Sequence, residues 1–359
     1  MVIDKLPGKR ILVIRYRFLG DTILTVPFLR NLRYAYPEGE ARIDMLVGPA
    51  SGEVLDGCPY VDNFIVYDTS RFHKYEQGKS KKRSFMSYAL DLRKEDYDLV
   101  FVLKRSWSSA LLALATGARY RVGYATEGRS IILTHPVPFN EKEHEVQSVL
   151  DVARAAGIEI RDDHLEAWIS EAERASIEEK VPELKEDGPK VLIHAAAAHP
   201  DKMYTKQGWV ELIRRLHEDY NFVPFFTGAG QDRTLYSEIA ALSGVKSVNM
   251  AGGLSIRESM ALYQKMDLAI CVDSGPAHLA CATGVPTFAL FGPTDPERWA
   301  PYGNNSRAIY DNNLDCRPCN YKKTCQNREC LTELSPATIL EALKENQIFK
   351  SGETGGDKL

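Results

Sequence analysis

The residues best suited to bind an anionic group lie between two apolar runs. Leu268–Val272 is a continuous apolar segment, typical of a strand buried on both faces, and it stops at Asp273-Ser274-Gly275. Pro276 suits the first position of a following helix, because its missing N–H costs nothing there. Backbone N–H groups, the Ser274 hydroxyl and a helix N-terminus would then converge on one spot. This arrangement binds phosphate without a metal.

Each residue of this loop also has an ordinary structural interpretation. Asp273 and Ser274 are common helix caps, Gly275 permits a turn, and His278 can be a satisfied histidine within a helix. Their combination in one loop favours the phosphate site.

Two further charged residues follow predicted strands. Asp21 comes after Gly20 beyond the strand Arg10–Tyr16, and Lys202 comes after the small residues 195–198. A carboxylate at a strand end can accept the proton of a reacting hydroxyl, and a lysine can neutralise charge that develops on a leaving diphosphate. A helix cap and a solvated surface lysine are the corresponding structural alternatives.

The elements that position these residues form a repeated pattern of strands and helices, which indicates parallel β-α-β units and an α/β fold. The charged segment 171–188 is predicted to be a helix that runs out into a linker. The pattern restarts after it, so we expect two halves with ligand loops at strand ends. Strands are predicted at Arg10–Tyr16, Arg42–Val47, Asn63–Tyr67, Leu99–Leu103, Tyr120–Tyr124, Lys190–Ala195, Phe222–Thr227, Leu268–Val272 and Thr287–Phe291. Helices are predicted at 22–36, with Pro27 as a kink or restart, and at Phe85–Lys94, Ser108–Ala115, Glu145–Gly157, Arg233–Leu242, Ile256–Lys265 and Pro336–Asn346.

Length and composition agree with two globular domains. The chain has 359 residues, 44% hydrophobic and 26% charged, and a net charge of −4. The lack of a basic excess argues against wholesale nucleic-acid binding. No stretch is long and apolar enough to span a bilayer, and residues 1–16 lack the apolar core of a signal peptide. We therefore expect a cytoplasmic protein, with any membrane contact being peripheral.

Four of the seven cysteines are clustered. Cys316, Cys319, Cys325 and Cys330 have C-x2-C-x5-C-x4-C spacing, which suits zinc, an iron–sulfur cluster or disulfides. The gap between the two pairs is shorter than in usual zinc ribbons. Reduced thiols that pack a C-terminal loop are the interpretation that we prefer.

Three separated motifs resemble those of glycosyltransferase family 9, the lipopolysaccharide heptosyltransferases. They are ILVIRYRFLGDTILTVPFLRNLR at 11–33, Lys202-Met203-Tyr204 before Trp209, and DSGPAHLACATGVPTFALFGPTDPERWAPYG at 273–303. Their order and separation make the resemblance specific over nearly the whole chain. The family pattern after the lysine is Lys-x-Trp, and Tyr204 departs from it.

The resemblance implies the GT-B fold, in which two Rossmann-like domains face a central cleft. It implies an acceptor-binding domain at 1–172, a linker at 173–188 and a nucleotide-sugar-binding domain at 189–335. A helix within 336–359, followed by a polar tail, is expected to return to the first domain.

The resemblance also implies roles for individual residues. Asp21 is the expected general base, Gly20 lets the backbone approach the substrate, and Lys202 neutralises the diphosphate. The expected donor-binding residues are Asp273, Ser274, Gly275, His278, Gly228, Gly292 and Thr294. No metal or cofactor is expected, because the helix N-terminus and the lysine offset the phosphate charge.

The acceptor site is expected to be basic. The segment 71–83, RFHKYEQGKSKKR, carries six basic residues against Glu76, and such runs are usually solvated loops. An acceptor with phosphates and acidic sugars would nevertheless require a basic loop. The expected acceptor-binding residues are Gly20, Arg17, Lys79, Lys81, Lys82 and Arg83, while Arg15, Lys104 and Arg105 also lie near strand ends.

The resemblance implies an inverting glycosyltransferase that moves heptose from ADP-heptose to the inner core of lipopolysaccharide, as a peripheral enzyme at the cytoplasmic face of the inner membrane. Alternatives are a family member with another nucleotide sugar or acceptor, and a catalytically silent protein that binds these ligands. An NAD-dependent oxidoreductase is disfavoured, because Arg233 replaces the third glycine of a dinucleotide fingerprint that begins at Gly228.

Overall fold

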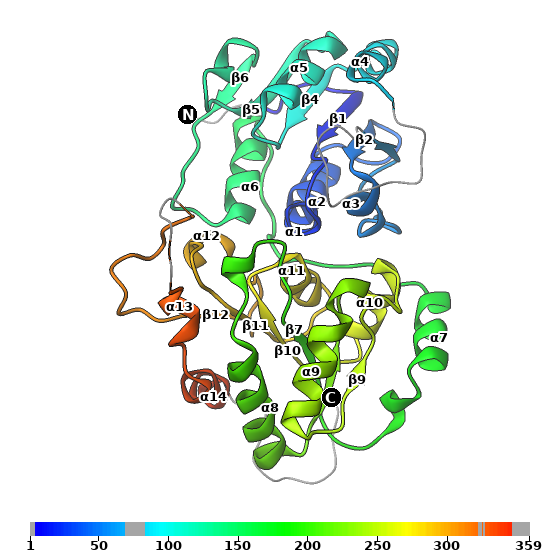
Figure 1. Ribbon diagram of the computed structural model, residues 1–359. Coiled ribbons are helices and arrows are strands. Elements are labelled where there is room, and N and C mark those ends of the chain that lie inside the picture. Colours follow the sequence, from blue (N-terminus) through cyan, green and yellow to red (C-terminus); the bar gives the residue numbers. More distant parts are fainter. Residues whose placement is uncertain (1–3, 69–82, 322–324, 326, 347–359) are drawn as a thin grey trace. The chain divides into compact units, whose positions relative to one another are not determined.

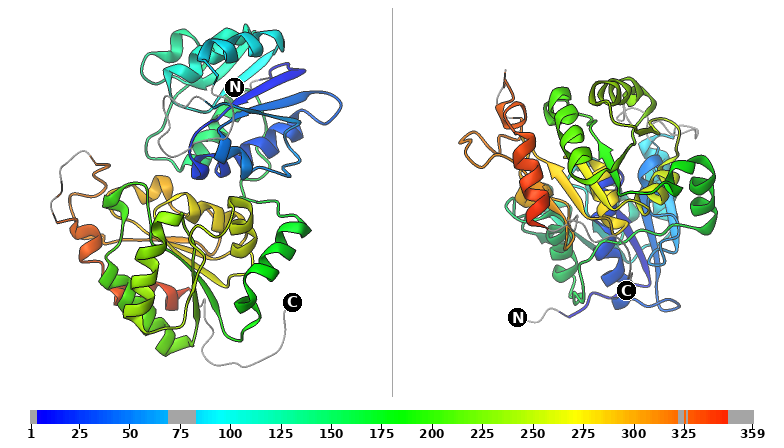
Figure 2. Two further views of the ribbon diagram at one scale, coloured as in Figure 1. Left: turned by 45° about the vertical axis from the view of Figure 1, so that its right-hand side comes forward. Right: turned by 90° about the horizontal axis from the view of Figure 1, so that it is seen from below.

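The computed structural model describes residues 4–68, 83–321, 325 and 327–346. The chain divides into two compact units, Met1–Ser170 and Glu171–Leu359. In each unit a six-stranded parallel sheet is covered by helices on both faces (Figures 1 and 2). This confirms the predicted α/β class with two Rossmann-like halves.

The first unit has the strand order β3-β2-β1-β4-β5-β6. Its helices α4 and α5 pack against each other, as do α2 and α6. The strands are β1 (Arg10–Ile14), β2 (Arg42–Val47), β3 (Asn63–Val66), β4 (Leu99–Val102), β5 (Tyr120–Tyr124) and β6 (His135–Val137). The helices are α1 (Leu19–Ile23), α2 (Val26–Ala35), α3 (Pro49–Glu53), α4 (Phe85–Lys94), α5 (Trp107–Thr116), the 3-10 turn η1 (Arg129–Ile131) and α6 (Glu145–Ala155).

The second unit has the strand order β12-β11-β10-β7-β8-β9, which is the same topology in a second copy. The strands are β7 (Lys190–His194), β8 (Val223–Phe226), β9 (Val248–Asn249), β10 (Leu268–Val272), β11 (Thr287–Leu290) and β12 (Arg307–Ile309). The helices are α7 (Glu171–Lys180), α8 (Lys206–Tyr220), α9 (Arg233–Ser243), α10 (Ile256–Tyr263), α11 (Gly275–Ala282), α12 (Pro296–Trp299), α13 (Glu329–Thr332) and α14 (Pro336–Glu345), with 3-10 turns η2 (Pro182–Lys185), η3 (Pro200–Lys202) and η4 (Gly230–Asp232).

The central strands form because their sequences are almost wholly apolar, as a parallel sheet covered on both faces requires. Every residue of β4 and of β10 is buried. Strand β10 pairs in parallel with both β7 and β11.

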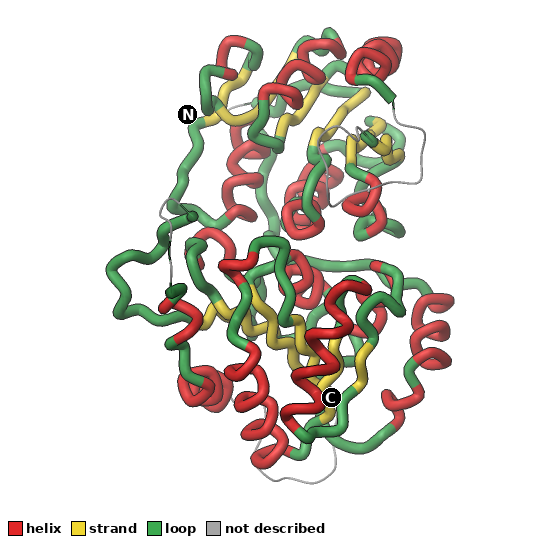
Figure 3. The backbone as a smooth tube through the Cα atoms, in the orientation of Figure 1, coloured by secondary structure: helices red, strands yellow, loops and turns green. Residues whose placement is uncertain are grey.

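The order of the strands fixes where loops can meet. In each sheet the order in which strands are added reverses beside the first strand, between β1 and β4 in the first unit and between β7 and β10 in the second. Ligands of such sheets bind beyond the carboxyl ends of the strands at this point. The loops after β1 and β4, and those after β7 and β10, are therefore the candidate ligand-binding loops of the two units (Figure 3).

The charged segment 171–188, expected as a helix that runs out into a linker, begins with α7, which packs against α10 through the Arg257–Glu173 and Lys180–Glu258 ion pairs. One expectation about the chain's organisation differs from the structure. Helix α14 was expected to return to the first domain. Instead it packs against α8, because Ile339, Leu340 and Leu343 belong to the core of the second unit.

Candidate active site

The donor-site residues predicted after β7 and β10 meet in the second unit. Lys202 Nζ lies 2.7 Å from Asp273 Oδ2. Thr294, in the loop after β11, donates its hydroxyl to the same Asp273 oxygen. Asp273 and Thr294 are both buried, whereas the Lys202 side chain is partly exposed. The loops that follow the adjacent strands β7, β10 and β11 thus hold the Lys202 ammonium group at the carboxyl ends of these strands.

The start of α11 lies in the same loop. Ser274 precedes the helix in an extended conformation and donates its hydroxyl to Val272 O at 3.0 Å, so this side chain does not cap the helix. The first N–H groups of a helix have no partner within the helix, which suits them to an anion. Gly275 is the first helical residue, Pro276 the second, and His278 is buried within the first turn and a half.

Two of the three predicted donor-site glycines, Gly228 and Gly292, have packing roles of their own. A Cβ on Gly292 would lie 2.7 Å from Leu331 Cδ1 and 3.2 Å from Asp201 O. A Cβ on Gly228 would lie 2.7 Å from Asp232 Oδ2. A side chain at either position would force a neighbouring group to shift.

Three residues of the segment after β12, Arg317, Asn320 and Arg328, hold the loops after β7 and β11 by hydrogen bonds. Arg317 donates to Gly292 O at 2.6 Å, the Asn320 N–H donates to Pro293 O at 2.8 Å, and Arg328 donates to Pro200 O at 2.8 Å. The Tyr321 ring packs on His199, with centroids 4.2 Å apart. The sequence did not predict these contacts, because the segment has no hydrophobic periodicity from which its path could be inferred.

The four clustered cysteines belong to the same segment. Cys316 and Cys325 are exposed, Cys319 is half-buried and Cys330 is buried; all four are free thiols. Burial raises the pKa of the Cys330 thiol, Arg317 opposes this shift, and the other three cysteines add to it. Within the described part of the chain, no group of three or more His, Cys, Asp or Glu side chains is placed to hold a metal ion.

In the first unit, Asp21 lies on α1 beside Arg15, which follows β1. Arg15 Nη2 is 3.5 Å from Asp21 Oδ2 and 2.7 Å from Glu145 Oε1. Burial raises the pKa of Asp21, the Arg15 charge lowers it, and the nearby Glu145 carboxylate raises it again. Phe18, directly before α1, has φ 59°, a conformation that costs energy for any residue other than glycine.

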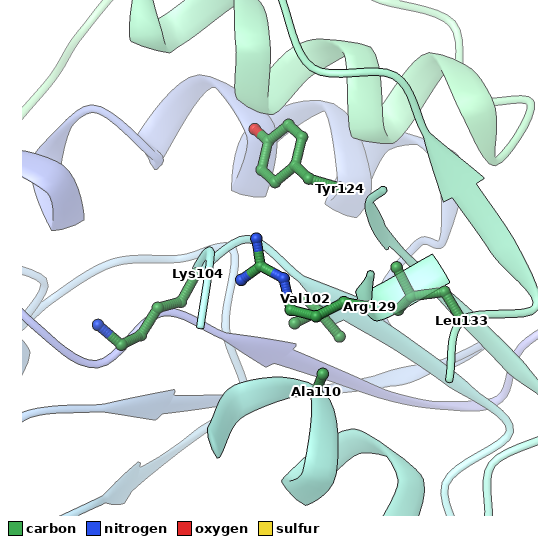
Figure 4. Close-up of a pocket in the computed structure, with 6 residues that line it drawn as sticks. All are labelled: Val102, Lys104, Ala110, Tyr124, Arg129 and Leu133. Carbon is green, nitrogen blue, oxygen red and sulfur yellow. The ribbon is translucent and has the colours of Figure 1, made fainter. Parts of the chain in front are cut away.

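A second group of cations surrounds the end of β4. Arg105 Nη1 lies 3.1 Å from Glu145 Oε2 and its guanidinium is 4.2 Å from the Phe139 ring centroid. A small pocket nearby is lined by Val102, Lys104, Ala110, Tyr124, Arg129 and Leu133. Figure 4 shows the Arg129 guanidinium inside this group of side chains and the Lys104 ammonium extending away from it. Arg129 Nη1 is buried without a hydrogen-bond partner, and burial lowers the pKa of this arginine.

The predicted acceptor residues are less concentrated. Gly20 is buried on α1, and the Arg17 guanidinium lies 4.5 Å from the Phe18 ring centroid. Arg83 is engaged with Ser87 and Asp91 of α4, so its charge is already paired locally. Lys79, Lys81 and Lys82 lie outside the described residues.

Sequence reasoning also missed Glu145 and Arg129. Glu145 begins a helix, where an acidic residue is ordinary, and only the structure shows that it is fully buried between two arginines. Arg129 follows a glycine in an irregular segment and carries no motif. The predicted residues Lys202, Asp273 and Thr294 do lie in contact, and their role in donor binding stays a prediction.

Comparison with known proteins identifies the family. The profile of glycosyltransferase family 9 (heptosyltransferase) matches residues 86–330. Lipopolysaccharide heptosyltransferase 3 of Escherichia coli is 27% identical over 349 residues, which cover 94% of this chain and 99% of that protein. Lipopolysaccharide core heptosyltransferase OpsX of Haemophilus influenzae is 22% identical over 354 residues, covering 95% and 98%.

Solved structures agree on the fold. A family 9 glycosyl transferase from Veillonella parvula superposes with a TM-score of 0.81 at 22% identity, covering 96% of this chain and 98% of its own. ADP-heptose lps heptosyltransferase II of E. coli gives a TM-score of 0.73 at 22% identity, with 94% and 98% covered. Both predictions, the family and its GT-B fold class, are confirmed. The chain belongs to glycosyltransferase family 9 (heptosyltransferase) and is a glycosyltransferase.

Proposed function

We propose that this protein transfers a heptose from ADP-heptose to the inner core of lipopolysaccharide, with inversion at the anomeric carbon. Relatives named as lipopolysaccharide heptosyltransferases span nearly its whole length. Solved structures of the same fold include an E. coli heptosyltransferase with ADP and one with ADP-2-deoxy-2-fluoro heptose. The observation that carries the proposal is the convergence of Lys202, Asp273 and Thr294 at the N-terminus of α11.

In the proposed reaction the second unit binds the donor. The diphosphate lies against the first N–H groups of α11 and the Ser274 loop, and Lys202 faces the phosphate oxygen that gains charge as the anomeric C–O bond breaks. Such fixed charges act most strongly where negative charge develops. The helix N-terminus and Lys202 both offset this charge from the chain's own groups.

The first unit binds the acceptor, and Asp21 is the base. As the acceptor oxygen bonds to the anomeric carbon, its proton passes to the Asp21 carboxylate and ADP leaves. A base works best when its pKa lies near the working pH, and the raised pKa of Asp21 supports this role. Arg17 and Gly20 adjoin Asp21, and we propose that Arg129 and Lys104 meet acidic groups of the acceptor.

The lipid part of the acceptor would bring the protein to the inner membrane as a peripheral enzyme of its cytoplasmic face. The structure describes no helix that is both long and apolar enough to cross a bilayer. Attachment would rest on the acceptor, for which Lys79, Lys81 and Lys82 remain proposed contacts.

A single-turnover assay tests the proposal. Purified protein is mixed with ADP-heptose and a series of truncated lipopolysaccharide acceptors, with and without EDTA, and ADP release and acceptor mass are followed. We expect one acceptor to gain the mass of one heptose at the same rate in both conditions.

Other outcomes would replace the proposal. Binding of ADP-heptose without modification of any acceptor would leave another acceptor or a catalytically silent binding protein. Absence of ADP-heptose binding would mean that another nucleotide sugar is the donor. Loss of turnover in EDTA would overturn the metal-independent mechanism.

A further inference from the structure

Glu145 is the first residue of α6, and its side chain is fully buried. Its Oε1 accepts a hydrogen bond from Arg15 Nη2 at 2.7 Å, and both of its oxygens lie within 3.3 Å of Arg105 Nη1. A buried carboxylate costs several kcal/mol of solvation and persists only when it is paired. Glu145 meets this condition with two arginines that follow the two central strands, β1 and β4.

The Arg15 guanidinium faces three acceptor groups and donates hydrogen bonds to two of them. Nη1 donates to Leu103 O at 2.5 Å, while Nη2 donates to Glu145 and stands 3.5 Å from Asp21 Oδ2. The contact with Asp21 is therefore too long for a good hydrogen bond. An arginine free of Glu145 could instead close on Asp21 with two parallel hydrogen bonds, the strong form of this pair.

We propose that Glu145 is a positioning residue for transfer: it holds Arg15 away from Asp21, so that the Asp21 carboxylate stays available to the acceptor hydroxyl. This inference rests on the proposed role of Asp21 as the base. Asp21 has about a quarter of its side chain exposed, whereas Arg15 and Glu145 are buried. The carboxylate that would react thus faces outward, and the two groups that restrain each other lie behind it.

The charged groups that face Asp21 come from three elements. Burial is the largest influence and raises the pKa of Asp21. Arg15 after β1, together with Arg105 and Lys104 after β4, lowers this pKa. Glu145 on α6 raises it. Removing Glu145 and removing Arg105 should therefore shift the titration of Asp21 in opposite directions, although both changes break the same buried ion pair.

This opposition separates positioning from a merely structural role. If Glu145 only fastened α6 to the sheet, Glu145→Gln and Arg105→Gln would both loosen the unit and reduce activity with one pH profile. If Glu145 restrains Arg15, the acidic limb of the kcat/KM profile moves to lower pH in Glu145→Gln and to higher pH in Arg105→Gln.

The experiment measures kcat and kcat/KM from pH 4.5 to 8.5 for the full-length protein with ADP-heptose and the acceptor found above. The variants are Glu145→Gln, Arg105→Gln and, as a control, Glu141→Gln, which removes an exposed carboxylate four residues before Glu145. We expect the opposite shifts just described and a plateau kcat about tenfold lower in Glu145→Gln, because a weaker base transfers protons more slowly. The control should match the unaltered protein, and ADP affinity should be unchanged throughout.

Two results would overturn the inference: an acidic limb that stays in place in both variants, or limbs that shift in the same direction. If Glu145→Gln does not fold, Glu145→Asp takes its place, because it keeps the charge but shortens the side chain that holds Arg15: an acidic limb shifted to lower pH supports the inference, and an unshifted limb overturns it. Asp21→Asn separates this inference from the proposed function. Undiminished turnover in Asp21→Asn would show that Asp21 is not the base. Lost turnover in Asp21→Asn, together with unshifted pH profiles in Glu145→Gln and Arg105→Gln, would keep Asp21 as the base and reject only the role of Glu145.

Discussion

The Lys202 ammonium lies 2.7 Å from Asp273 Oδ2, and this ion pair joins the loops that follow the two central strands of the second unit. Asp273 is buried and also accepts the Thr294 hydroxyl, so its position is fixed from two sides. The direction of Lys202 is therefore set by a rigid partner at the sheet edge. A preorganised cation of this kind costs no reorganisation during reaction.

Replacing Lys202 by Ala should lower kcat by about 10²–10³-fold, because one charge aimed at the leaving diphosphate is lost. ADP affinity should fall as well, which isothermal titration can measure. Lys206→Ala is the matched control, since Lys206 lies four residues further on and pairs with Glu238 on the surface. Equal losses in the two variants would show that Lys202 has no special role.

Asp273→Ala should reduce kcat largely through Lys202, which loses the group that directs it. The combined Lys202→Ala/Asp273→Ala variant should then be scarcely slower than Lys202→Ala alone, because residues in contact are not additive. A double-mutant cycle on kcat measures this coupling. Fully additive losses would mean that the two residues act independently.

Asp21→Asn should lower turnover by about 10²–10⁴-fold, the usual contribution of a general base, while ADP binding stays unchanged. In the unaltered protein, kcat/KM should fall as the pH drops and Asp21 takes up a proton, and this fall should begin above the ordinary range of a carboxyl group because the Asp21 pKa is raised. Asp56→Asn, a change at an exposed carboxylate, is the control. An acidic limb in Asp21→Asn identical to that of the unaltered protein would assign the titration to another group.

Much of this architecture follows from sequence pattern, because buried parallel strands need apolar runs and helices need a 3.6-residue period. Strand β10 and helix α4 have their predicted bounds, and Pro27 marks the restart at α2. The edge strands β6, β9 and β12 have only two or three residues, too few for a pattern, and were missed.

The candidate site divides in the same way. Lys202 and Asp273 could be predicted because each follows an apolar strand, and adjacent parallel strands end at one edge. The contacts of Glu145 with Arg15 and Arg105 join segments far apart in the chain, and no local pattern encodes them. The hydrogen bonds from Arg317 and Arg328 could not be predicted either, because they are donated to backbone carbonyl groups, which every residue has.

Gly292→Ala should destabilise the second unit by about 1–3 kcal/mol, as overpacking of a filled core does. The added methyl group would lie 2.7 Å from Leu331 Cδ1 and 2.9 Å from Leu331 Cγ, and Leu331 is fully buried. Urea unfolding measures the loss. Gly230→Ala is the control, since the nearest atom to its Cβ, Gly252 Cα, is 3.9 Å away. Equal stability of the two variants would show that Leu331 moves aside without cost.

The buried His194 at the end of β7 should make the second unit sensitive to acid. Burial lowers the pKa of His194 to about 4, although backbone hydrogen bonds with Thr227 and Ala196 oppose the shift. Between this pH and the ordinary histidine value of about 6.5, the unfolded chain binds a proton that the folded chain excludes. Stability is therefore complete above about pH 6.5 and falls by roughly 3 kcal/mol as the pH drops toward 4.

His194→Gln should remove this part of the pH dependence, because glutamine does not titrate. Urea-unfolding free energies at pH 7.5 and pH 4.5 measure it, with His217→Gln as the control, since His217 is a partly exposed histidine of the same unit. We expect the difference between the two pH values to shrink in His194→Gln and to persist in His217→Gln. The same acid sensitivity in both variants would mean that other groups cause it, and that His194 can be protonated without unfolding the unit.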